Sequence, residues 1–456
     1  MKYRIEKDSP QSAYLQLYHQ LRGDIVSGVY PNGKKLPSKR LLAEQTGVSV
    51  ITVEHAYAIL CDEGYLEPRE RSGYFVSYSA ADCFPVAEPD SVRQLPSARD
   101  LADDFPFSVL AKTMRRVLSE YGESILVKSP NNGCTELRKA IAAYLARCRG
   151  INVAPSQIVI GSGAEYLYGL IVQLLGRERV FALENPSYEK IRRVYLANGV
   201  TCDMLRLGGD GIRTSELART DASVLHVTPF HSFPSGITAS AGKRSEYIRW
   251  AHSRGGYIVE DDFDSEFTLS SKAEDTLFSL EPKRSVLYLN TFSKTIAPSM
   301  RLGYMVLPES LTDAFEQSVG FYSCTVPVFE QYVLAELLSN GDFERHINRM
   351  RTYYRNKRDH LLQYLANCPA AKALQVEGEN SGLHFLLHLT TEASDSQLRE
   401  VALKAGLQIK FLSDYYHNRL SDNSHTMLMN YTGIEDARLY PALDKLFEAL
   451  LPYLML

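Results

Sequence analysis

The segment 286–308, VLYLNTFSKTIAPSMRLGYMVLP, decides how this chain of 456 residues is interpreted. An apolar run at each end predicts a strand, and the turn between the two runs carries Lys294. Thr291 and Ser293 place two hydroxyls close to that lysine, and Arg301 follows it by seven positions. A lysine on a loop is more often a solvated charge, but a lysine in a pocket with neighbouring positive charge can also act as a reactive amine.

Hydroxyls and a guanidinium beside one lysine suit a cofactor that carries a phosphate and an aldehyde, which indicates pyridoxal 5′-phosphate. Two further segments would then supply complementary chemistry. GSGAE at 161–165 opens a predicted helix whose first amides form a phosphate cradle. VEDDFDSEF at 259–267 ends a predicted strand and offers Asp261 as the partner of a protonated pyridine nitrogen. Glycine-rich turns and solvated acidic loops are both common, so neither segment is specific on its own.

Two other segments offer the remaining parts of such a site. ENPSY at 184–188 contains Tyr188, an aromatic side chain that suits stacking on the cofactor ring. TPFHSFPSG at 228–236 contains His231, which could reach the phenolic oxygen of the cofactor. A single tyrosine is more often plain packing and a histidine is often structural, so the order of all five segments carries the argument.

The bulk properties limit the class of protein. The chain is 45% hydrophobic and 23% charged, which is ordinary globular composition and predicts two or three domains. It contains no apolar run long enough for a membrane span, and its polar start does not resemble a signal peptide, so we expect a cytoplasmic protein. Seven cysteines without a CxxC pair favour reduced thiols over a disulfide framework, and no metal site is predicted.

The charge pattern allows, but does not demand, a nucleic-acid partner. Residues 1–78 hold 10 Lys and Arg against 9 Asp and Glu, while the whole chain carries a net charge of −4. Any case for DNA therefore depends on where the charges are placed. The segment 79–104 is rich in Ala, Pro, Ser and Asp and is predicted to link a head at 10–78 to a large α/β domain at 105–456.

The head has the pattern of a winged helix-turn-helix. Three amphipathic stretches predict helices, the second capped by Ser38 and ended by Gly47, the third capped by Ser49. A hairpin with its turn at Ser72-Gly73 follows. The alternative is a small helical domain for protein contact. The residues predicted to contact DNA are Lys35, Ser38, Lys39, Arg40, Ser49, Ile51, Thr52, His55, Arg69, Arg71 and Gly73.

Residues 17–76 resemble the winged helix-turn-helix of GntR-type bacterial regulators along nearly their whole length. The match includes LPSKR at 36–40, TVEHAY at 52–57 and the wing glycine. That family usually has an arginine after the serine that opens the recognition helix, and this chain has Val50 there. The resemblance therefore implies double-stranded DNA as a partner without implying the base preference, the operator or the target genes.

Residues 105–455 resemble fold type I aminotransferases, and the whole chain resembles the MocR-type regulators, which join such a domain to a GntR-type head. The resemblance implies a large parallel-rich sheet with a small C-terminal α/β subdomain from about 340, and a homodimer. It implies that Lys294 forms the internal aldimine with pyridoxal 5′-phosphate. The complete set of predicted cofactor-binding residues is Ser162, Gly163, Ala164, Glu165, Tyr188, His231, Asp261, Phe263, Thr291, Ser293, Lys294 and Arg301.

The chain departs from the family pattern at positions that bear on activity. Phe263 stands where the family has a tyrosine that bonds the phenolic oxygen, and Lys128 stands where the partner subunit usually supplies a tyrosine. In TMLMNYTGI at 426–434, Leu428 aligns with the arginine that grips a substrate carboxylate. A leucine cannot bind a carboxylate, although Lys190 could partly replace the arginine.

Two functions follow from these features. The first is a transcriptional regulator whose aminotransferase-like domain senses pyridoxal phosphate, or an amine or amino-acid-like effector such as a dipeptide. The second is a functional aminotransferase with an accessory DNA-binding head. The missing arginine and the Phe263 substitution disfavour efficient turnover, while half-reactions stay possible. Neither the effector nor the direction of control, activation or repression, follows from the sequence.

Overall fold

The structure is a computed structural model that describes residues 3, 5, 11–69, 72–78, 105–267, 274–379, 382–417, 424–432, 434 and 436–455. The predicted linker 79–104 and the predicted DNA contact Arg71 lie outside the described residues. The chain divides into two compact units, Met1–Leu95 and Pro96–Leu456. Each unit is described by itself.

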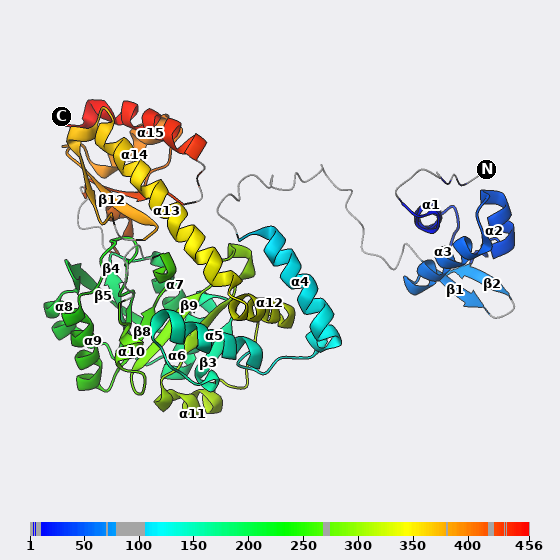
Figure 1. Cartoon of the computed structure of the whole chain (residues 1–456), viewed down its shortest axis with the longest axis horizontal. Coiled ribbons are helices and arrows are strands. Elements are labelled where there is room, and N and C mark those ends of the chain that lie inside the picture. Colours follow the sequence, from blue (N-terminus) through cyan, green and yellow to red (C-terminus); the bar gives the residue numbers. More distant parts are fainter. Residues whose placement is uncertain are drawn as a thin grey trace. The chain divides into compact units, whose positions relative to one another are not determined.

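The first unit contains three helices and a two-stranded hairpin (Figure 1). Leu17, Leu21 and Ile25 form the buried face of the first helix and pack against the other two. Ser38 and Ser49 cap the second and third helices, as the sequence predicts, by accepting hydrogen bonds from the amides of Leu41 and Thr52. The elements are α1 (Ala13–Val26), α2 (Lys39–Thr46), α3 (Val50–Asp62), β1 (Leu66–Arg69) and β2 (Gly73–Val76).

The second unit is built on an eight-stranded sheet in the order β3-β10-β9-β8-β7-β4-β5-β6. The central strands β9, β8, β7, β4 and β5 are parallel, while β10 is antiparallel to both of its neighbours and β6 is antiparallel to β5. The bounds are β3 (Ile158–Gly161), β4 (Val180–Asn185), β5 (Thr201–Gly208), β6 (Gly211–Ile212), β7 (Val224–Val227), β8 (Tyr257–Asp261), β9 (Val286–Thr291) and β10 (Gly303–Val306).

Helices cover both faces of this sheet, because successive strand residues point to opposite sides. Ile258 and Val286 belong to one apolar layer, whereas their neighbours Val259 and Leu287 belong to the other. Helices α6, α7 and α11 lie on the second face, and α5, α8, α9, α10 and α12 lie on the first. The bounds are α4 (Phe107–Tyr121), α5 (Thr135–Arg149), α6 (Ala164–Leu175), α7 (Glu189–Ala197), α8 (Thr214–Arg219), α9 (Ala241–Arg254), α10 (Leu277–Leu280), α11 (Glu309–Ser318) and α12 (Val328–Ser339).

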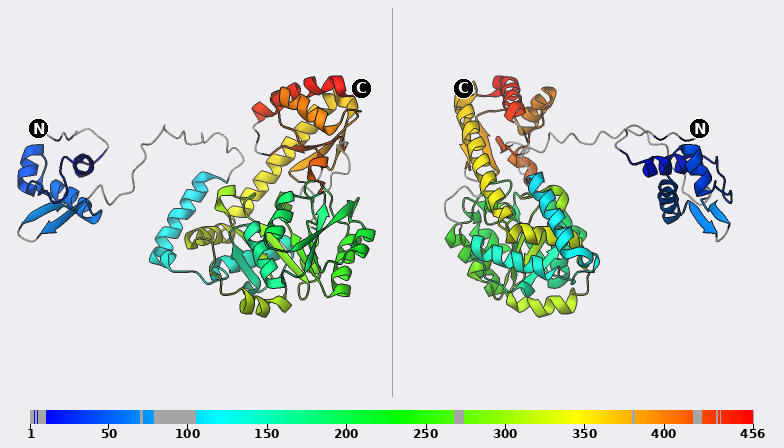
Figure 2. Two further views of the ribbon diagram at one scale, coloured as in Figure 1. Left: turned by 180° about the vertical axis from the view of Figure 1, so that it is seen from behind. Right: turned by 45° about the vertical axis from the view of Figure 1, so that its right-hand side comes forward.

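The long helix α13 (Asp342–Asn367) leads from the large sheet into a smaller C-terminal subdomain (Figures 1 and 2). Its first half packs against the turn after β9, where the Phe343 and Phe292 rings lie 5.6 Å apart. Tyr354, further along α13, packs against Phe267 after β8 at the same distance. The subdomain contains an antiparallel sheet in the order β11-β12-β13 and two more helices. The bounds are β11 (Leu374–Glu377), β12 (His384–Leu389), α14 (Asp395–Lys404), β13 (Thr426–Asn430) and α15 (Asp436–Leu450).

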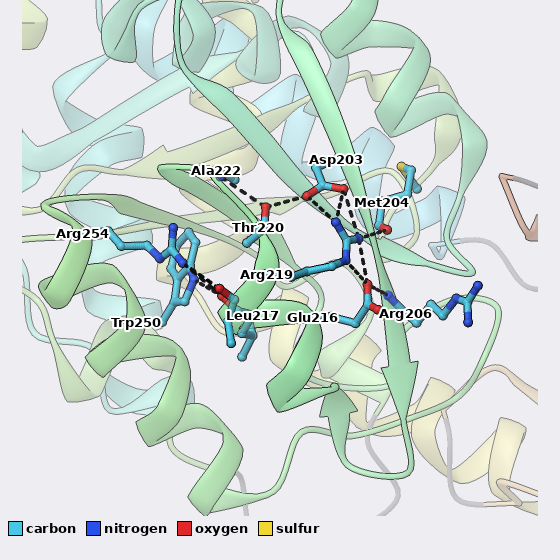
Figure 3. Close-up of polar contacts among 11 residues, drawn as sticks. Asp203, Met204, Arg206, Glu216, Leu217, Arg219, Thr220, Ala222, Trp250 and Arg254 are labelled. Atoms are coloured by element: carbon cyan, nitrogen blue, oxygen red, sulfur yellow. Dashed lines mark hydrogen bonds and ion pairs between the residues drawn. The ribbon is translucent and has the colours of Figure 1, made fainter.

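A polar network fixes the edge of the large sheet to the helices beside it (Figure 3). The Arg219 guanidinium at the end of α8 bonds both oxygens of Asp203 on β5 and also the Glu216 carboxylate. Next to it, Trp250 Nε1 on α9 donates to the Leu217 carbonyl at 3.0 Å. The network lies at the sheet edge formed by β5 and β6, so its role is to hold α8 and α9 in place.

Some features are absent from the part of the chain that the structure describes. None of its helices combines the length and the apolarity that a bilayer crossing requires. Its six cysteines are all free thiols. No cluster of His, Cys, Asp and Glu in the same residues is arranged to hold a metal ion.

Candidate cofactor and effector site

Two adjoining compartments lie at the carboxyl ends of the central strands. The inner compartment has a volume of about 320 Å³ and the outer compartment about 400 Å³. Carboxyl ends of parallel strands are the usual place for ligands in open α/β sheets. The two compartments share Ala164, Tyr168, Tyr188, Ile191, Phe263, Thr291 and Lys294 in their walls.

Lys294 lines both compartments because the turn after β9 is anchored on either side of it. Phe292 and Ile296 are buried, and the Ile296 amide donates to the Phe292 carbonyl at 2.9 Å. The Lys294 side chain is left outside this packed turn, with its Nζ 5.5 Å from the centre of the Phe263 ring. It makes no hydrogen bond or ion pair with any residue that the structure describes, so its amine is available to a ligand.

Asp261 forms the floor of the inner compartment. It is the last residue of β8, is 5% exposed and accepts a hydrogen bond from the Tyr168 hydroxyl on α6. His226 Nε2 lies 3.5 Å from the same carboxylate oxygen, and His226 Nδ1 lies 2.8 Å from the Tyr195 hydroxyl. With a proton on Nε2 facing the carboxylate, Nδ1 accepts from Tyr195. Tyr168 thus bonds the Asp261 carboxylate directly, and His226, held in turn by Tyr195, lies beside it.

Burial controls the protonation of the tyrosine beside Asp261. Desolvation, with a further contribution from the Asp261 charge, raises the pKa of Tyr168 well above its ordinary value. Tyr168 is therefore a hydroxyl donor across the physiological range. The sequence did not reveal Tyr168, His226 or Tyr195 as site residues, because their role depends on α6, α7 and β7 meeting around the end of β8.

The outer compartment is closed by the start of α6 and by Arg301. Gly163 caps α6 with φ of 94°, and a Cβ at that position would lie 3.3 Å from Arg301 Nη2. Gly303 pairs with both Gly161 and Thr291 in the sheet, which brings the turn after β3 beside the turns around β10. No side chain caps α6, so its first-turn amides are free to bind an anion.

Two cations converge on one carboxylate at this end of the site. Lys190 Nζ lies 2.5 Å and Arg301 Nη2 lies 3.6 Å from Glu165 Oε1. The hydrogen bond from Lys190 is the main cause that lowers the pKa of Glu165. Lys190 lines the outer compartment and not the inner one. It therefore does not lie in the inner compartment, where it would have to replace the missing arginine in binding a substrate carboxylate.

The other residues predicted to bind the cofactor divide into those that line the compartments and those that do not. Tyr188 lines both compartments and is 48% exposed, and Ser293 lines the outer one. Ser162 lines neither and lies directly before Gly163. Thr291, Phe263 and Ala164 line both compartments.

The position of His231 differs from the prediction. His231 is buried with φ of 50°, lines neither compartment, and has its Nδ1 3.8 Å from Asp264 Oδ1. The amide of Ser232 bonds the Ile237 carbonyl, and this bridge fixes the loop so that Phe233 faces the cavity. In this loop conformation, which the sequence does not specify, the apolar Phe233 lines the cavity where the polar His231 was predicted.

The small subdomain supplies the far wall of the inner compartment. His384 and Asn430 are cross-strand partners in β12 and β13, and both line the cavity with Leu383. Leu428 is two residues earlier on β13, pairs with Leu386 and lines neither compartment. Among the described residues that line the inner compartment, Lys294 is the single lysine or arginine, so no guanidinium is placed there to hold a carboxylate.

The residues of this site fit pyridoxal 5′-phosphate. The outer compartment offers a helix N-terminus, hydroxyls and Arg301 to a phosphate, and Asp261 is oriented toward a position that a pyridine nitrogen can occupy. Gly163 leaves the space that a bound phosphate needs. The unpartnered Lys294 amine lies between these two ends. The donor set therefore covers the phosphate, the ring nitrogen and the aldehyde of this cofactor, whereas Phe263 offers no hydroxyl to its phenolic oxygen.

In the head, the described residues predicted to contact DNA lie in α2 and α3, shortly before these helices, or in the hairpin. Ile51 is 65% exposed at the start of α3. Lys39 is not free, because its Nζ bonds Glu54 at 2.6 Å and lies over the Tyr74 ring. Lys35 bridges to β2 at Phe75 and passes over Gly73. The other predicted contacts within the described residues are Ser38, Arg40, Ser49, Thr52, His55 and Arg69, of which Arg69 pairs with Glu67.

Comparisons with known proteins agree with both halves of this description. Residues 99–416 match the family of class I and II aminotransferases, and residues 13–76 match the gntR family of bacterial regulatory proteins. Kynurenine aminotransferase of Pyrococcus horikoshii superposes on 76% of this chain and 88% of its own with a TM-score of 0.66 at 23% identity. A multiple-substrate aminotransferase of Thermococcus profundus gives a TM-score of 0.68 at 22% identity over 78% of this chain and 90% of its own.

Several curated proteins match this chain over most of its length. An uncharacterized HTH-type transcriptional regulator of Bacillus subtilis, YdeL, is 32% identical over 96% of both chains. The pyridoxine biosynthesis regulator PdxR of Corynebacterium glutamicum is 30% identical over 92% of both chains, and the probable rhizopine catabolism regulator MocR of Rhizobium meliloti is 27% identical over 98% of this chain and 95% of its own. The chain belongs to the MocR-type transcriptional regulators, in which a gntR-family head precedes an aminotransferase class I and II domain. This membership implies DNA binding by the head and pyridoxal 5′-phosphate as the cofactor.

Proposed function

We propose that this regulator binds pyridoxal 5′-phosphate covalently through Lys294 and that the cofactor, alone or with an amine effector, controls DNA binding by the head. The observation that carries the proposal is the unpartnered Lys294 amine between an anion-binding end and a buried carboxylate. When bound, the cofactor supplies an aldehyde that reacts with amines and a ring that withdraws electrons.

The protein residues have separate roles in this proposal. Arg301, Ser293 and the first amides of α6 bind the phosphate. Asp261, oriented by Tyr168 and His226, holds a proton on the ring nitrogen. Lys294 would hold the cofactor through its side-chain amine, at the end that carries the aldehyde.

Efficient transamination is not part of the proposal. Phe263 lies beside Lys294 and has no hydroxyl to offer to the phenolic oxygen, and no guanidinium lines the inner compartment within the described residues. A substrate carboxylate and the phenolic oxygen of the cofactor would each lack a binding group. The alternative is a functional aminotransferase with an accessory DNA-binding head, and the presence of Lys294 and Asp261 supports it.

A homodimer is also proposed. Leu126 and Val127 are 82% and 65% exposed, and Phe321 is 68% exposed. Asn131 joins these segments by donating to the Gly320 carbonyl at 2.8 Å. Exposed apolar surface of this kind is typical of association. A dimer would present two heads to paired half-sites.

The test compares the full chain with its Lys294→Ala variant. We expect the wild type to show a visible cofactor band that borohydride reduction makes permanent, and the variant to lose the band on dialysis. Footprinting on the upstream DNA of the gene is expected to show site-specific protection that changes with cofactor in the wild type only. Rapid steady-state transamination of amines without site-specific protection would instead establish the enzyme alternative.

A further inference from the structure

One carboxylate in the inner compartment has no role in holding the cofactor. Asp264 is 1% exposed and lines the inner compartment, and its Oδ1 accepts no hydrogen bond. His231 Nδ1 lies 3.8 Å from this oxygen, which is beyond hydrogen-bond distance. A buried carboxylate oxygen without a donor is unfavourable, so a ligand that supplies one would be bound there.

His384, on the same wall, presents a second acceptor. Its Nε2 lies 3.2 Å from the Pro234 carbonyl, so Nε2 carries the hydrogen and Nδ1 keeps its lone pair. Burial lowers the pKa of His384, so the ring is neutral near pH 7 and provides no positive charge for a carboxylate.

Asn430 completes the wall as a neutral group. Its Oδ1 accepts from the amide of Thr432 at 3.0 Å and from the Thr432 hydroxyl at 2.7 Å. The free part of the side chain is therefore its NH₂ group, which can bond a hydroxyl or carbonyl but cannot neutralise a carboxylate. The wall that faces Lys294 thus carries one carboxylate and, among the described residues that line it, no lysine or arginine.

We propose that the effector of this regulator is an amine with a second, cationic nitrogen, and that Asp264 binds that nitrogen with His384 as an additional acceptor. The inference rests on the proposed function, because the first amine of the ligand must lie at the Lys294 end of the cavity. An α- or ω-amino acid would instead place its carboxylate against Asp264, where like charges repel. The ligand class is therefore a diamine or an aminoguanidine rather than an amino acid.

The experiment uses the cofactor-loaded full chain and two probes of equal length, 1,4-diaminobutane and 4-aminobutanoate. Calorimetry measures the affinity for each, and the visible band of the cofactor gives an independent readout. We expect the diamine to bind at least tenfold more tightly than the amino acid. Equal binding, tighter binding of the amino acid, or no binding of either probe to loaded protein would overturn the inference. A third probe, 4-aminobutylguanidine, shows whether an ammonium or a guanidinium is preferred.

Two variants change the charge of the wall in opposite directions. Asp264→Asn is expected to lower the affinity for the diamine at least tenfold and to raise that for the amino acid. Asn430→Asp adds a carboxylate that can still accept from Thr432, so it should raise the affinity for the diamine. Glu400→Gln, which removes an exposed carboxylate paired with Lys404 on α14, is the control and should change neither affinity. If Asp264→Asn does not fold, the affinity of Asn430→Asp for the diamine tests the inference, and an affinity that is not raised contradicts it.

Failure of this inference is distinguishable from failure of the proposed function. A protein that holds the cofactor and protects DNA but lacks the preference for the diamine contradicts only the inference. A protein without a cofactor band, or whose DNA binding ignores the cofactor, contradicts the proposed function before any effector is added.

Discussion

At the residue scale, two side chains of the proposed cofactor site differ in how they are held by the protein. Lys294 contacts only the Phe263 ring among the described residues, whereas Asp261 accepts a hydrogen bond from Tyr168 and lies 3.5 Å from His226. The contrast has a physical reason. A reactive amine must be free to meet its ligand, while a carboxylate that stabilises a protonated ring nitrogen must keep its position and its charge.

Buried carboxylates near the site make a prediction about pH. Desolvation raises the pKa of Glu184 to about 8, and its Oε2 accepts from the Ser232 hydroxyl at 2.7 Å. The folded protein therefore keeps this proton while the unfolded chain, with a pKa of 4.5, loses it. The stability that this proton contributes is complete below about pH 4.5 and is lost as the pH rises toward about 8.

Glu184→Gln should remove that dependence. We expect the free energy of unfolding of the wild type to fall, relative to the variant, by about 1 kcal/mol per pH unit between pH 5 and 7. Denaturant titrations followed by fluorescence measure this in the second unit, because the one tryptophan of the chain, Trp250, lies in α9. Parallel curves for the two proteins across this range would show that Glu184 is already ionised in the folded state.

The sequence was sufficient to predict that a residue lines the cavity where the end of a strand or the start of a helix fixes the position of its side chain. Lys294, Asp261 and Tyr188 all line the cavity for this reason. His231 does not, because the bridge between Ser232 and Ile237 turns the loop. Whether a side chain on an irregular loop faces a cavity depends on hydrogen bonds that sequence patterns do not contain.

At the element scale, local signals were sufficient for the head. Ser38, Gly47 and Ser49 bound α2 and α3 where the sequence places them, because capping hydrogen bonds form between neighbours in the chain. The ion pair between Lys39 on α2 and Glu54 on α3 was not predictable, since it requires the angle between the two helices.

That ion pair leads to a prediction about DNA binding. Glu54→Gln should release Lys39 for a phosphate and remove one negative charge from α3, so affinity for operator DNA should rise severalfold. The slope of log affinity against log salt should steepen by about 1. Fluorescence anisotropy at several salt concentrations measures both quantities.

A matched control separates the local effect from a general change in charge. Asp62→Asn removes the same charge from the other end of α3 and is expected to have a smaller effect on both quantities. If the two variants have the same affinity and the same salt dependence, the ammonium group of Lys39 does not contact DNA.

At the scale of the whole molecule, the chain consists of two units with separate cores. Within the second unit, α13 contacts the turn that carries Lys294 and the segment after Asp261, and it continues into the subdomain that supplies His384 and Asn430. The helix α13 therefore connects the two parts of the second unit whose residues form opposite walls of the inner compartment.

The two-unit organisation predicts separate thermal transitions. Calorimetry of the full chain should show one transition for the head and one for the cofactor unit, and added pyridoxal 5′-phosphate should raise only the second. At a concentration one hundred times the dissociation constant the stabilisation is about 3 kcal/mol. In Lys294→Ala this shift should shrink. A single transition that moves as a whole would show that the units unfold together.

The amino-acid sequence was enough to predict the order of the segments, the parallel-rich sheet, the two-part organisation and the position of Lys294 in the turn after β9. These depend on periodicity, capping and turn chemistry, which are properties of neighbouring residues. The tertiary structure decided which residues orient Asp261, that His231 lies outside the cavity, and that the far wall is made of Asp264, His384 and Asn430. These depend on packing between segments that lie far apart in the chain, and no local pattern records the distance between them.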